Sequence, residues 1–441
     1  MKPGKYDVVI IGAGVGGMCA AALLTHDGYK TLLVERTPLL GGRCSTMEYK
    51  GFKLTTGVIN LSPGGNVNQI FDQVGAPFDI GAEPHVAFRV NSKDYEMPSQ
   101  GGLRWLLSQV SSNAETEKMM GAIKKAFTWQ EPAGAISFYD WLRQYTQNET
   151  ILNIFQALVS SQMVVNSWEL SARGVIRFLE LARSFRVCGF ARHGNMSLWE
   201  SLAKVITGKG GDIWTECPAK RILVNRDVAT GVVVEKAGKE VEVSAQVVIS
   251  DAGPRATVEL AGSDNFDKGY LKELNETLRP SPIVWVQSAI NTPHFNHQGW
   301  ITITDSRRVN AVVCPTIACP ELAPKGKHLL LSGSGPVSSL PPFDFKKEIE
   351  LHLMDLGDNF PEFTRYGEVL NAGCFWGEWP GTRTWPGYEM PQKTSIVNLY
   401  NVGDAVVPSG MGSTPGVAES ARLVVADLKQ RIRPAENTRS V

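Results

Sequence analysis

Three glycines near the amino terminus have the spacing that binds the phosphates of a dinucleotide. Gly12, Gly14 and Gly17 lie between a predicted strand and a predicted helix. Glycine at these places permits a tight turn, a close approach of pyrophosphate to the backbone and close packing of helix on strand. Glu35 ends the next predicted strand, where its carboxylate can accept a hydrogen bond from a ribose hydroxyl. The spacing therefore predicts a dinucleotide site.

A second group of residues extends this predicted surface and favours FAD over NAD. Arg36 follows Glu35, and the run Gly41-Gly42-Arg43 comes soon after. A glycine pair lets the backbone pass close to a large ligand, and the Arg43 guanidinium can bind pyrophosphate. The alternative for this segment is a plain glycine loop with a solvated arginine.

The carboxyl-terminal part carries a third candidate group. Gly403 and Asp404 follow a predicted strand, and we expect Gly416 to open an amphipathic helix that includes Val417. The Asp404 carboxylate can hold the ribityl hydroxyls of a flavin. The free N–H groups and positive dipole of the helix end can face the flavin pyrimidine, where they favour the negative charge of the reduced ring.

Composition excludes several other classes of protein. The 441 residues carry 44 basic and 44 acidic side chains, a formal net charge of zero, so we expect no nucleic-acid partner. The seven cysteines form no Cys-x-x-Cys pair, and the sequence predicts neither a disulfide framework nor a metal site. The chain enters a strand almost at once and has no apolar run long enough to cross a bilayer. We expect a cytoplasmic protein, with peripheral membrane contact left open.

Hydrophobic periodicity places these motifs on a succession of elements. Helical spacing covers 101–186, with Ser137, Asn148 and Ser171 as expected N-caps, and a further helix is expected at 345–357. Strands are expected at 6–11, 31–34, 221–224, 231–235, 240–243, 246–250, 283–290, 299–304, 328–333 and 398–402.

This order predicts an α/β protein built from two interleaved domains. The first is a Rossmann-like FAD-binding domain, a parallel sheet with a β-meander, at 1–62, 190–255 and 370–441. The second is an inserted α+β substrate-binding domain with an antiparallel sheet and helices, at 63–189 and 256–369.

Four segments together resemble the FAD-dependent amine oxidase superfamily and, within it, the phytoene desaturase-like branch. They read DVVIIGAGVGGMCAAALL, VERTPLLGGRCST, ARHGNMSLWESLAKVI and LYNVGDAVVPSGMGSTPGVAESAR. The resemblance implies noncovalent FAD along Gly12, Gly14, Gly17, Glu35, Arg36, Gly42, Arg43, Asp404 and Val417. It further implies that the backbone of Ile222 meets the adenine and that Gly57 passes the isoalloxazine ring. Thr56 stands where phytoene desaturases usually carry an acidic residue. This difference weakens the inference that the protein shares their exact substrate.

Aromatic residues crowd the segment before the last strand. Trp376, Trp379, Trp385 and Tyr388 lie where amine oxidases of the superfamily form a wall opposite the flavin, and the alternative is packing at a domain seam. We assign the wall first to Trp376, with Trp385 and Tyr388 as further candidates. His193, in the third motif, is the best-placed candidate for a general base.

Hydride removal by a flavin asks little of side chains beyond orientation and a dry pocket. We therefore expect an FAD-dependent dehydrogenase that desaturates a carbon–carbon bond of a hydrophobic isoprenoid or alicyclic small molecule. A flavin amine oxidase and a redox-neutral flavin-dependent isomerase are the alternatives. The electron acceptor (oxygen, a quinone or an electron-transfer protein) and the oligomeric state stay open.

Overall fold

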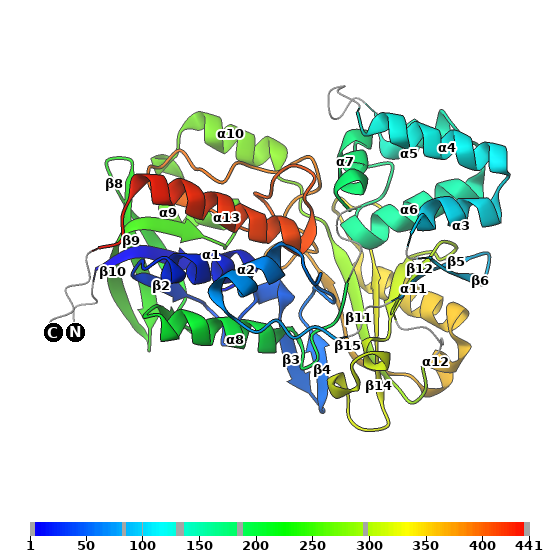
Figure 1. The fold of residues 1–441 in the computed structure, drawn as a ribbon, viewed down its shortest axis with the longest axis horizontal. Helices are drawn as coiled ribbons and strands as arrows, with labels where there is room; N and C mark the ends of the chain where they lie inside the picture. Colours follow the sequence, from blue (N-terminus) through cyan, green and yellow to red (C-terminus); the bar gives the residue numbers. More distant parts are fainter. Residues whose placement is uncertain are drawn as a thin grey trace.

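The computed structural model describes residues 5–81, 85–98, 100–128, 136–182, 188–293 and 299–435. Two large sheets organise these residues into two lobes (Figure 1). One lobe combines the amino-terminal, central and carboxyl-terminal parts of the chain, so that α1, β10 and α13 lie together. The other lobe holds the helices α3–α7 and the strands β11–β15. The predicted α/β class, with a Rossmann-like part and an antiparallel part, is confirmed.

The first sheet has a parallel core and an antiparallel extension. Its order is β7, β2, β1, β10, β9, β8, with β16 beside β10. β1, β2, β7, β10 and β16 pair in parallel, whereas β8, β9 and the first half of β10 form a meander. The bounds are β1 Tyr6–Ile11, β2 Thr31–Val34, β7 Asp212–Trp214, β8 Ala219–Asn225, β9 Val228–Lys236, β10 Lys239–Ser250 and β16 Leu399–Asn401.

The register of this sheet brings three distant loops to one edge. Ile11 at the end of β1 lies opposite Ser250 of β10, which lies opposite Asn401 of β16. The turns that begin at Gly12, Asp251 and Val402 therefore leave the sheet side by side. Ligands of parallel sheets bind at such a carboxyl edge.

Helices cover both faces of the first sheet. α1 (Val15–His26), α2 (Asn66–Val74), α8 (Asn195–Gly208) and α13 (Ser413–Arg431) share one hydrophobic cluster with Val8 and Ile10 of β1. α9 (Pro254–Ala261) and α10 (Lys268–Thr277) pack on the opposite face with Val9 and Ile11. The alternate residues of β1 thus enter different cores, which explains why this strand is apolar throughout.

The second sheet is largely antiparallel, in the order β15, β11, β14, β13, β12, β5, β6. α11 and α12 pack on one face of this sheet. The helices α3–α7 form a helical cluster, and α6 of this cluster contacts β12, β13 and β14. The strands are β5 His85–Val90, β6 Lys93–Glu96, β11 Ile283–Ile290, β12 Gly299–Ile303, β13 Val309–Val313, β14 His328–Ser334 and β15 Glu368–Phe375. The helices are α3 Gly102–Val110, α4 Asn113–Ala126, α5 Phe138–Arg143, α6 Glu149–Met163, α7 Ala172–Ala182, α11 Phe345–Asn359 and α12 Pro361–Tyr366.

The predicted helix starts in this lobe are confirmed by hydrogen bonds. Ser137 accepts from Asp140 N, Asn148 from Thr150 N, and Ser171 from Gly174 N. No helix of the described residues is both long and apolar enough to span a membrane.

Several elements differ from the sequence expectation. α13 begins at Ser413, so Gly416 lies inside its first turn and does not open it. β10 is one continuous strand where two short ones were expected, because its first half pairs with β9 and its second half with β1. β13, β15 and the hairpin of β3 (Thr46–Tyr49) with β4 (Phe52–Thr55) are additional.

The predicted domain division remains a prediction, and packing departs from it at four segments. α2, α10 and most of α9, expected in the substrate-binding domain, pack on the first sheet. β15, which the prediction splits at residue 370, pairs with β11 of the second sheet. The sequence of a short segment near a domain boundary does not indicate which of the two lobes the segment packs against.

Candidate functional site

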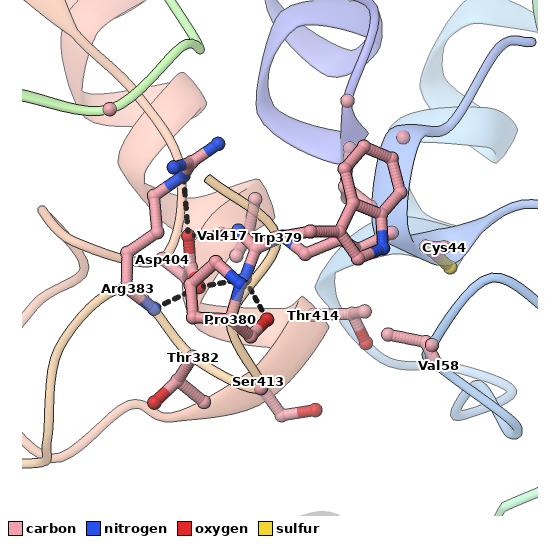
Figure 2. A pocket seen from close by; sticks show the side chains of 18 of the residues that line it. Cys44, Val58, Trp379, Pro380, Thr382, Arg383, Asp404, Ser413, Thr414 and Val417 are labelled. Carbon is pink, nitrogen blue, oxygen red and sulfur yellow. Dashed lines mark hydrogen bonds and ion pairs between the residues drawn. The ribbon is translucent and has the colours of Figure 1, made fainter. Parts of the chain in front are cut away.

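A cavity of about 1070 Å³ extends from the carboxyl edge of the first sheet to the face of the second. Of the predicted residues, those that line it are Gly12, Gly14, Glu35, Arg36, Gly42, Arg43, Gly57, Trp376, Gly403, Asp404 and Val417. Figure 2 shows part of this lining, with Arg383 beside Asp404 on one side of Pro380 and with Trp379, Thr414 and Val58 on the other side. The fold thus brings the three predicted groups together from opposite ends of the chain.

The glycine-rich turn is shaped by close backbone contacts. Gly12 has a φ of +95°, a left-handed conformation that favours glycine. A side chain on Gly17 would meet the carbonyl oxygen of Gly12 at 2.0 Å, so this glycine permits α1 to pack against the turn rather than lining the cavity. Gly14 caps α1 without a side chain of its own, and Gly14 and Val15 line the cavity, so the positive amino end of the helix faces the cavity, with Gly17 N already bound by Asp251.

Glu35 is buried and holds this turn in place. One of its carboxylate oxygens accepts from Ala13 N at 2.8 Å, and the other accepts from Thr37 N at 2.8 Å and from the Thr37 hydroxyl at 2.9 Å. The carboxylate also lines the cavity. Its position is therefore fixed by the protein before any ligand arrives.

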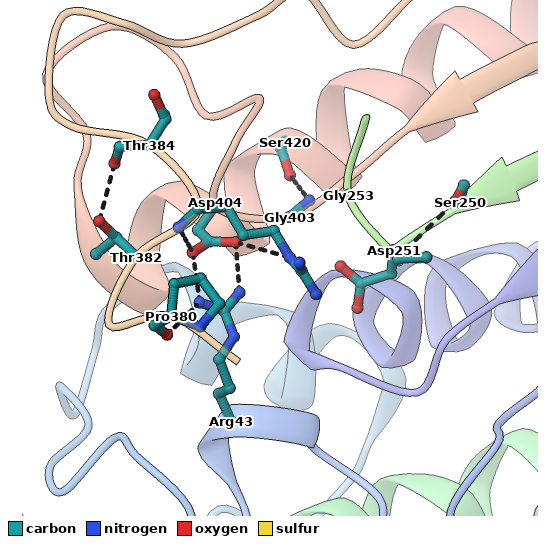
Figure 3. A network of polar contacts seen from close by, with 12 residues as sticks. Arg43, Ser250, Asp251, Gly253, Pro380, Thr382, Thr384, Gly403, Asp404 and Ser420 are labelled. Carbon is teal, nitrogen blue, oxygen red and sulfur yellow. Dashed lines mark hydrogen bonds and ion pairs between the residues drawn. The ribbon is translucent and has the colours of Figure 1, made fainter. Parts of the chain in front are cut away.

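Arg43 and Asp404 form a charged pair inside the cavity (Figure 3). Arg43 Nη1 and Nη2 donate to Asp404 Oδ2 at 2.8 Å and Oδ1 at 2.6 Å. Burial alone would raise the pKa of Asp404, but the charge and hydrogen bonds of Arg43, aided by Arg383, lower it to about 2. Both groups therefore stay charged at neutral pH.

Arg383 is a second arginine in the cavity lining. Its Nε is 3.8 Å from Asp404 Oδ1, and its backbone N donates to Asp404 Oδ2 at 2.8 Å. Burial lowers the pKa of Arg383, and the neighbouring charge of Arg43 lowers it further. The cavity thus gathers two arginines around one carboxylate, an arrangement suited to an anion.

Asp251 is a site residue that the sequence reasoning did not single out. It follows β10 directly and lines the cavity (Figure 3). Its carboxyl group accepts a hydrogen bond from Gly17 N at 2.9 Å. A side chain on Gly14 would lie 2.3 Å from Asp251 Oδ2. Burial raises the pKa of Asp251 to about 7. Its place at the end of a parallel strand was the available signal, because ligands bind at that edge of the sheet.

The aromatic segment divides between cavity and core. Trp376 lines the cavity and packs edge-on against Phe343, while Trp379 lines it and donates from Nε1 to Thr56 O at 3.1 Å. Trp385 is only 1% exposed, belongs to the core of the helical cluster with Tyr388 packed against it, and does not line the cavity. Of the four aromatic residues, Trp376 and Trp379 therefore line the cavity, and Trp385 and Tyr388 do not.

Three further predicted residues lie outside the cavity lining. His193 is exposed, because the neighbouring Asn195 is the residue that turns inward and donates to Val58 O. Ile222 lies on β8 and is buried in the hydrophobic core of the first lobe, although Ala219 and Lys220 of the same strand line the cavity. Gly416 is buried in the first turn of α13.

Gly57 and Thr56 form part of the wall near Arg43. A side chain on Gly57 would meet Arg43 O at 2.6 Å, which explains glycine there. The Thr56 hydroxyl donates to Gly42 O at 2.8 Å and accepts from Ser45 N at 2.9 Å. The threonine at this departure from the phytoene desaturase pattern therefore joins two backbone segments of the wall.

The far half of the cavity is built from the second lobe. Its lining comes from α6, α7 and one face of the second sheet, and comprises Ser160, Ser161, Gln162, Val164, Phe178, Leu181, Trp285, Trp300, Asn310, Ala311, Gly333 and Ser334. This set contains no acidic and no basic side chain. Across the described residues, no group of three His, Cys, Asp or Glu side chains is arranged to hold a metal ion.

Sequence comparison places relatives along most of the chain. Residues 10–74 match the model of an NAD(P)-binding Rossmann-like domain. An uncharacterised protein of Methanocaldococcus jannaschii is 26% identical over 94% of this chain and 98% of its own length. A 15-cis-phytoene desaturase of Capsicum annuum is 21% identical over 97% and 79%. A prolycopene isomerase of Daucus carota is 23% identical over 74% and 60%.

Comparison of folds agrees with these relatives. An oxidoreductase from Methanosarcina mazei superposes with a TM-score of 0.85 at 28% identity, over 96% of this chain and 100% of its own. A putrescine oxidase superposes with a TM-score of 0.74 at 15% identity over 97% and 100%. The resemblance to the FAD-dependent amine oxidase superfamily and its phytoene desaturase-like branch is thereby confirmed, and this chain is similar to members of that group in sequence and in fold.

Proposed function

We propose that the protein binds FAD noncovalently at the carboxyl edge of the first sheet. The open amino end of α1 and the arginines Arg43 and Arg383 suit a pyrophosphate, because all three offer donors and positive charge to an anion. Gly14 and Gly42 support the same ligand, because glycine lets the backbone approach a ligand closely. The two lie side by side in the cavity wall, since a side chain on Gly42 would lie 3.3 Å from the Gly14 Cα. Glu35, at the edge of this cradle, suits a ribose hydroxyl.

We propose further that the reaction is the dehydrogenation of a carbon–carbon bond in an uncharged, largely apolar isoprenoid or alicyclic molecule. The observation that carries this proposal is the far half of the cavity, in which Trp285, Trp300 and Phe178 stand among neutral side chains. FAD supplies hydride acceptance when bound. The far-half residues place and orient the substrate, which is the main demand that hydride transfer makes on a protein.

The segment from Trp376 to Arg383 has a water-excluding role in this account. It is tied to the first lobe by Trp379 Nε1 to Thr56 O, by Arg43 Nη1 to Pro380 O at 3.2 Å, and by the Arg36–Glu378 ion pair. These contacts hold the segment against the first lobe, where its residues line the cavity. A dry cavity strengthens the electrostatic interactions made inside it.

An amine oxidase is the second candidate, favoured by the fold shared with putrescine oxidase. A protonated amine would need a counter-charge on burial, and the far half of the described cavity lining has no carboxylate. This difference favours the uncharged substrate. A redox-neutral isomerase, the activity named for the carrot relative, uses the same apolar surface and differs in needing no net electron acceptor.

Two experiments test the proposal. Acid precipitation of the purified protein should release all the flavin as FAD, whereas flavin retained on the denatured chain or NAD alone would contradict the cofactor assignment. Incubation with isoprenoid alcohols and alicyclic ketones plus a quinone should yield products lighter by two hydrogens. Products of unchanged mass would favour the isomerase, and aldehyde formed from amines would favour the oxidase.

A further inference from the structure

Asn310 is a buried amide that faces the cavity without a partner. It lies on β13 at an irregularity, where the register with β14 shifts between Val309 and Ala311. The residue is only 7% exposed and lines the cavity. Its side-chain amide makes no hydrogen bond with any described residue. Bulges of this kind re-aim a side chain and are frequent beside active sites.

A buried amide elsewhere in the same lobe is fully paired. Gln287 of β11 accepts from Thr55 N at 2.9 Å and donates to Thr55 O at 2.9 Å, which joins β11 to β4. The Gln287 amide thus has hydrogen-bond partners because it connects two strands of the protein. The Asn310 amide, by contrast, has no partner among the described residues and stays accessible from the cavity, where its N–H and C=O groups are available to a bound molecule.

Two more amides in the cavity lining share the property of Asn310. Gln162 at the end of α6 and Asn60 after β4 line the cavity and make no hydrogen bond within the described part of the chain. Gln162 is exposed and Asn60 is half-buried, so water can satisfy both. Asn310 is the least exposed of the three residues, so a molecule bound in the cavity would displace the water that reaches its amide and would have to replace those hydrogen bonds.

We propose that the substrate carries an uncharged oxygen function, a hydroxyl or a carbonyl, that hydrogen-bonds to the Asn310 amide. This inference rests on the proposed function and narrows its substrate class from a hydrocarbon to an oxygenated molecule. An amide can donate to a carbonyl and can both donate to and accept from a hydroxyl. A hydrocarbon in the same place would displace water from the amide without replacing its hydrogen bonds. Sites that hydrogen-bond a substrate group discriminate against analogues that lack this group.

The test measures binding of three labelled probes to the FAD-loaded protein. Geranylgeraniol, its aldehyde and the hydrocarbon with the same skeleton are equilibrated by dialysis, without oxygen or another electron acceptor. We expect at least one oxygenated probe to bind tenfold or more tightly than the hydrocarbon. Asn310→Leu should remove this preference and leave FAD affinity unchanged, and Asn310→Ala repeats the test without added bulk. Asn153→Leu, on the exposed face of α6, is the matched control.

Thermal unfolding of the same variants separates a ligand role from a structural one. Because Asn310 makes no internal hydrogen bond, Asn310→Leu should unfold at or above the wild-type midpoint, and a lower midpoint in both Asn310 variants would overturn the inference. Equal or tighter binding of the hydrocarbon by the wild-type protein would overturn it while leaving the proposed reaction standing. Failure of all three probes to bind would contradict the isoprenoid substrate and this inference together.

Discussion

Arg43 and Asp404 meet in a two-point ion pair although they come from opposite ends of the chain. Their side chains remain only 20% and 15% exposed, and the N–O distances are 2.8 and 2.6 Å. Arg43 belongs to the glycine pair after β2, and Asp404 to the turn after β16. The pair therefore locks together two motifs that the sequence separates by most of its length.

Asp404→Ala should destabilise the protein more than removal of both charges. The single variant leaves the Arg43 guanidinium in the cavity wall without its carboxylate, a loss of about 2 kcal/mol or more for a largely buried pair. The double variant Arg43→Met/Asp404→Leu removes this unpaired guanidinium, whereas Arg383 loses its Asp404 neighbour in both variants, so that loss cancels in the comparison. Urea unfolding of the apoprotein measures both free energies, and equal losses in the two variants would contradict this account.

Asp251→Asn should stabilise the apoprotein at pH 8 more than at pH 5. Burial raises the pKa of Asp251 to about 7, so the folded protein binds a proton that the unfolded chain releases above its ordinary pKa near 4. Wild-type stability therefore falls as pH rises from about 4 to 7, and the asparagine avoids that loss. One pKa unit corresponds to about 1.4 kcal/mol.

Urea unfolding at the two pH values measures this difference. Asparagine can still accept the hydrogen bond from Gly17 N, which keeps the turn intact. A gain for Asp251→Asn that does not grow between pH 5 and pH 8 would show that the Asp251 carboxyl titrates normally.

Glu35→Ala should weaken FAD binding about ten- to hundredfold, the equivalent of a charge-assisted hydrogen bond worth roughly 1.5 to 3 kcal/mol. The variant also leaves Ala13 N and Thr37 N without their acceptor, so Glu35→Gln, which can still accept, should lose less. Flavin fluorescence titration measures the affinity. Turnover at saturating FAD should largely recover, and an unchanged dissociation constant would remove Glu35 from the site.

Trp376→Ala and Trp385→Ala should have opposite signatures. Trp376 lines the cavity, so its loss should raise KM or slow flavin reduction severalfold while FAD stays bound. Trp385 is core, so its loss should cost about 3 to 5 kcal/mol of folding free energy. Stopped-flow reduction and urea unfolding of both variants test this assignment, which an unaltered reduction rate and KM in Trp376→Ala would refute.

The sequence predicted the first lobe well because its signals are local. The glycine turn, the apolar strand before it and the acid after β2 all lie within the first 35 residues, and each has its own backbone requirement. The helix caps at Ser137 and Asn148 were equally readable, since a cap acts within three residues.

What escaped prediction depends on contacts between distant segments. Asp251 matters because the register of β10 with β1 places it against Gly14 and Gly17. Trp376 and Trp385 look alike in sequence, and only packing separates the cavity wall from the core. Asn310 gave no motif at all, because its exposure to the cavity arises from a register shift between β13 and β14.

Anaerobic reduction of the bound flavin tests the central claim most directly. The FAD-loaded protein is mixed with an oxygenated isoprenoid such as geranylgeraniol or with an aliphatic diamine, and the absorbance of oxidised flavin is followed. The account predicts bleaching by the isoprenoid and none by the diamine. Bleaching by the diamine alone would identify an amine oxidase and contradict the account.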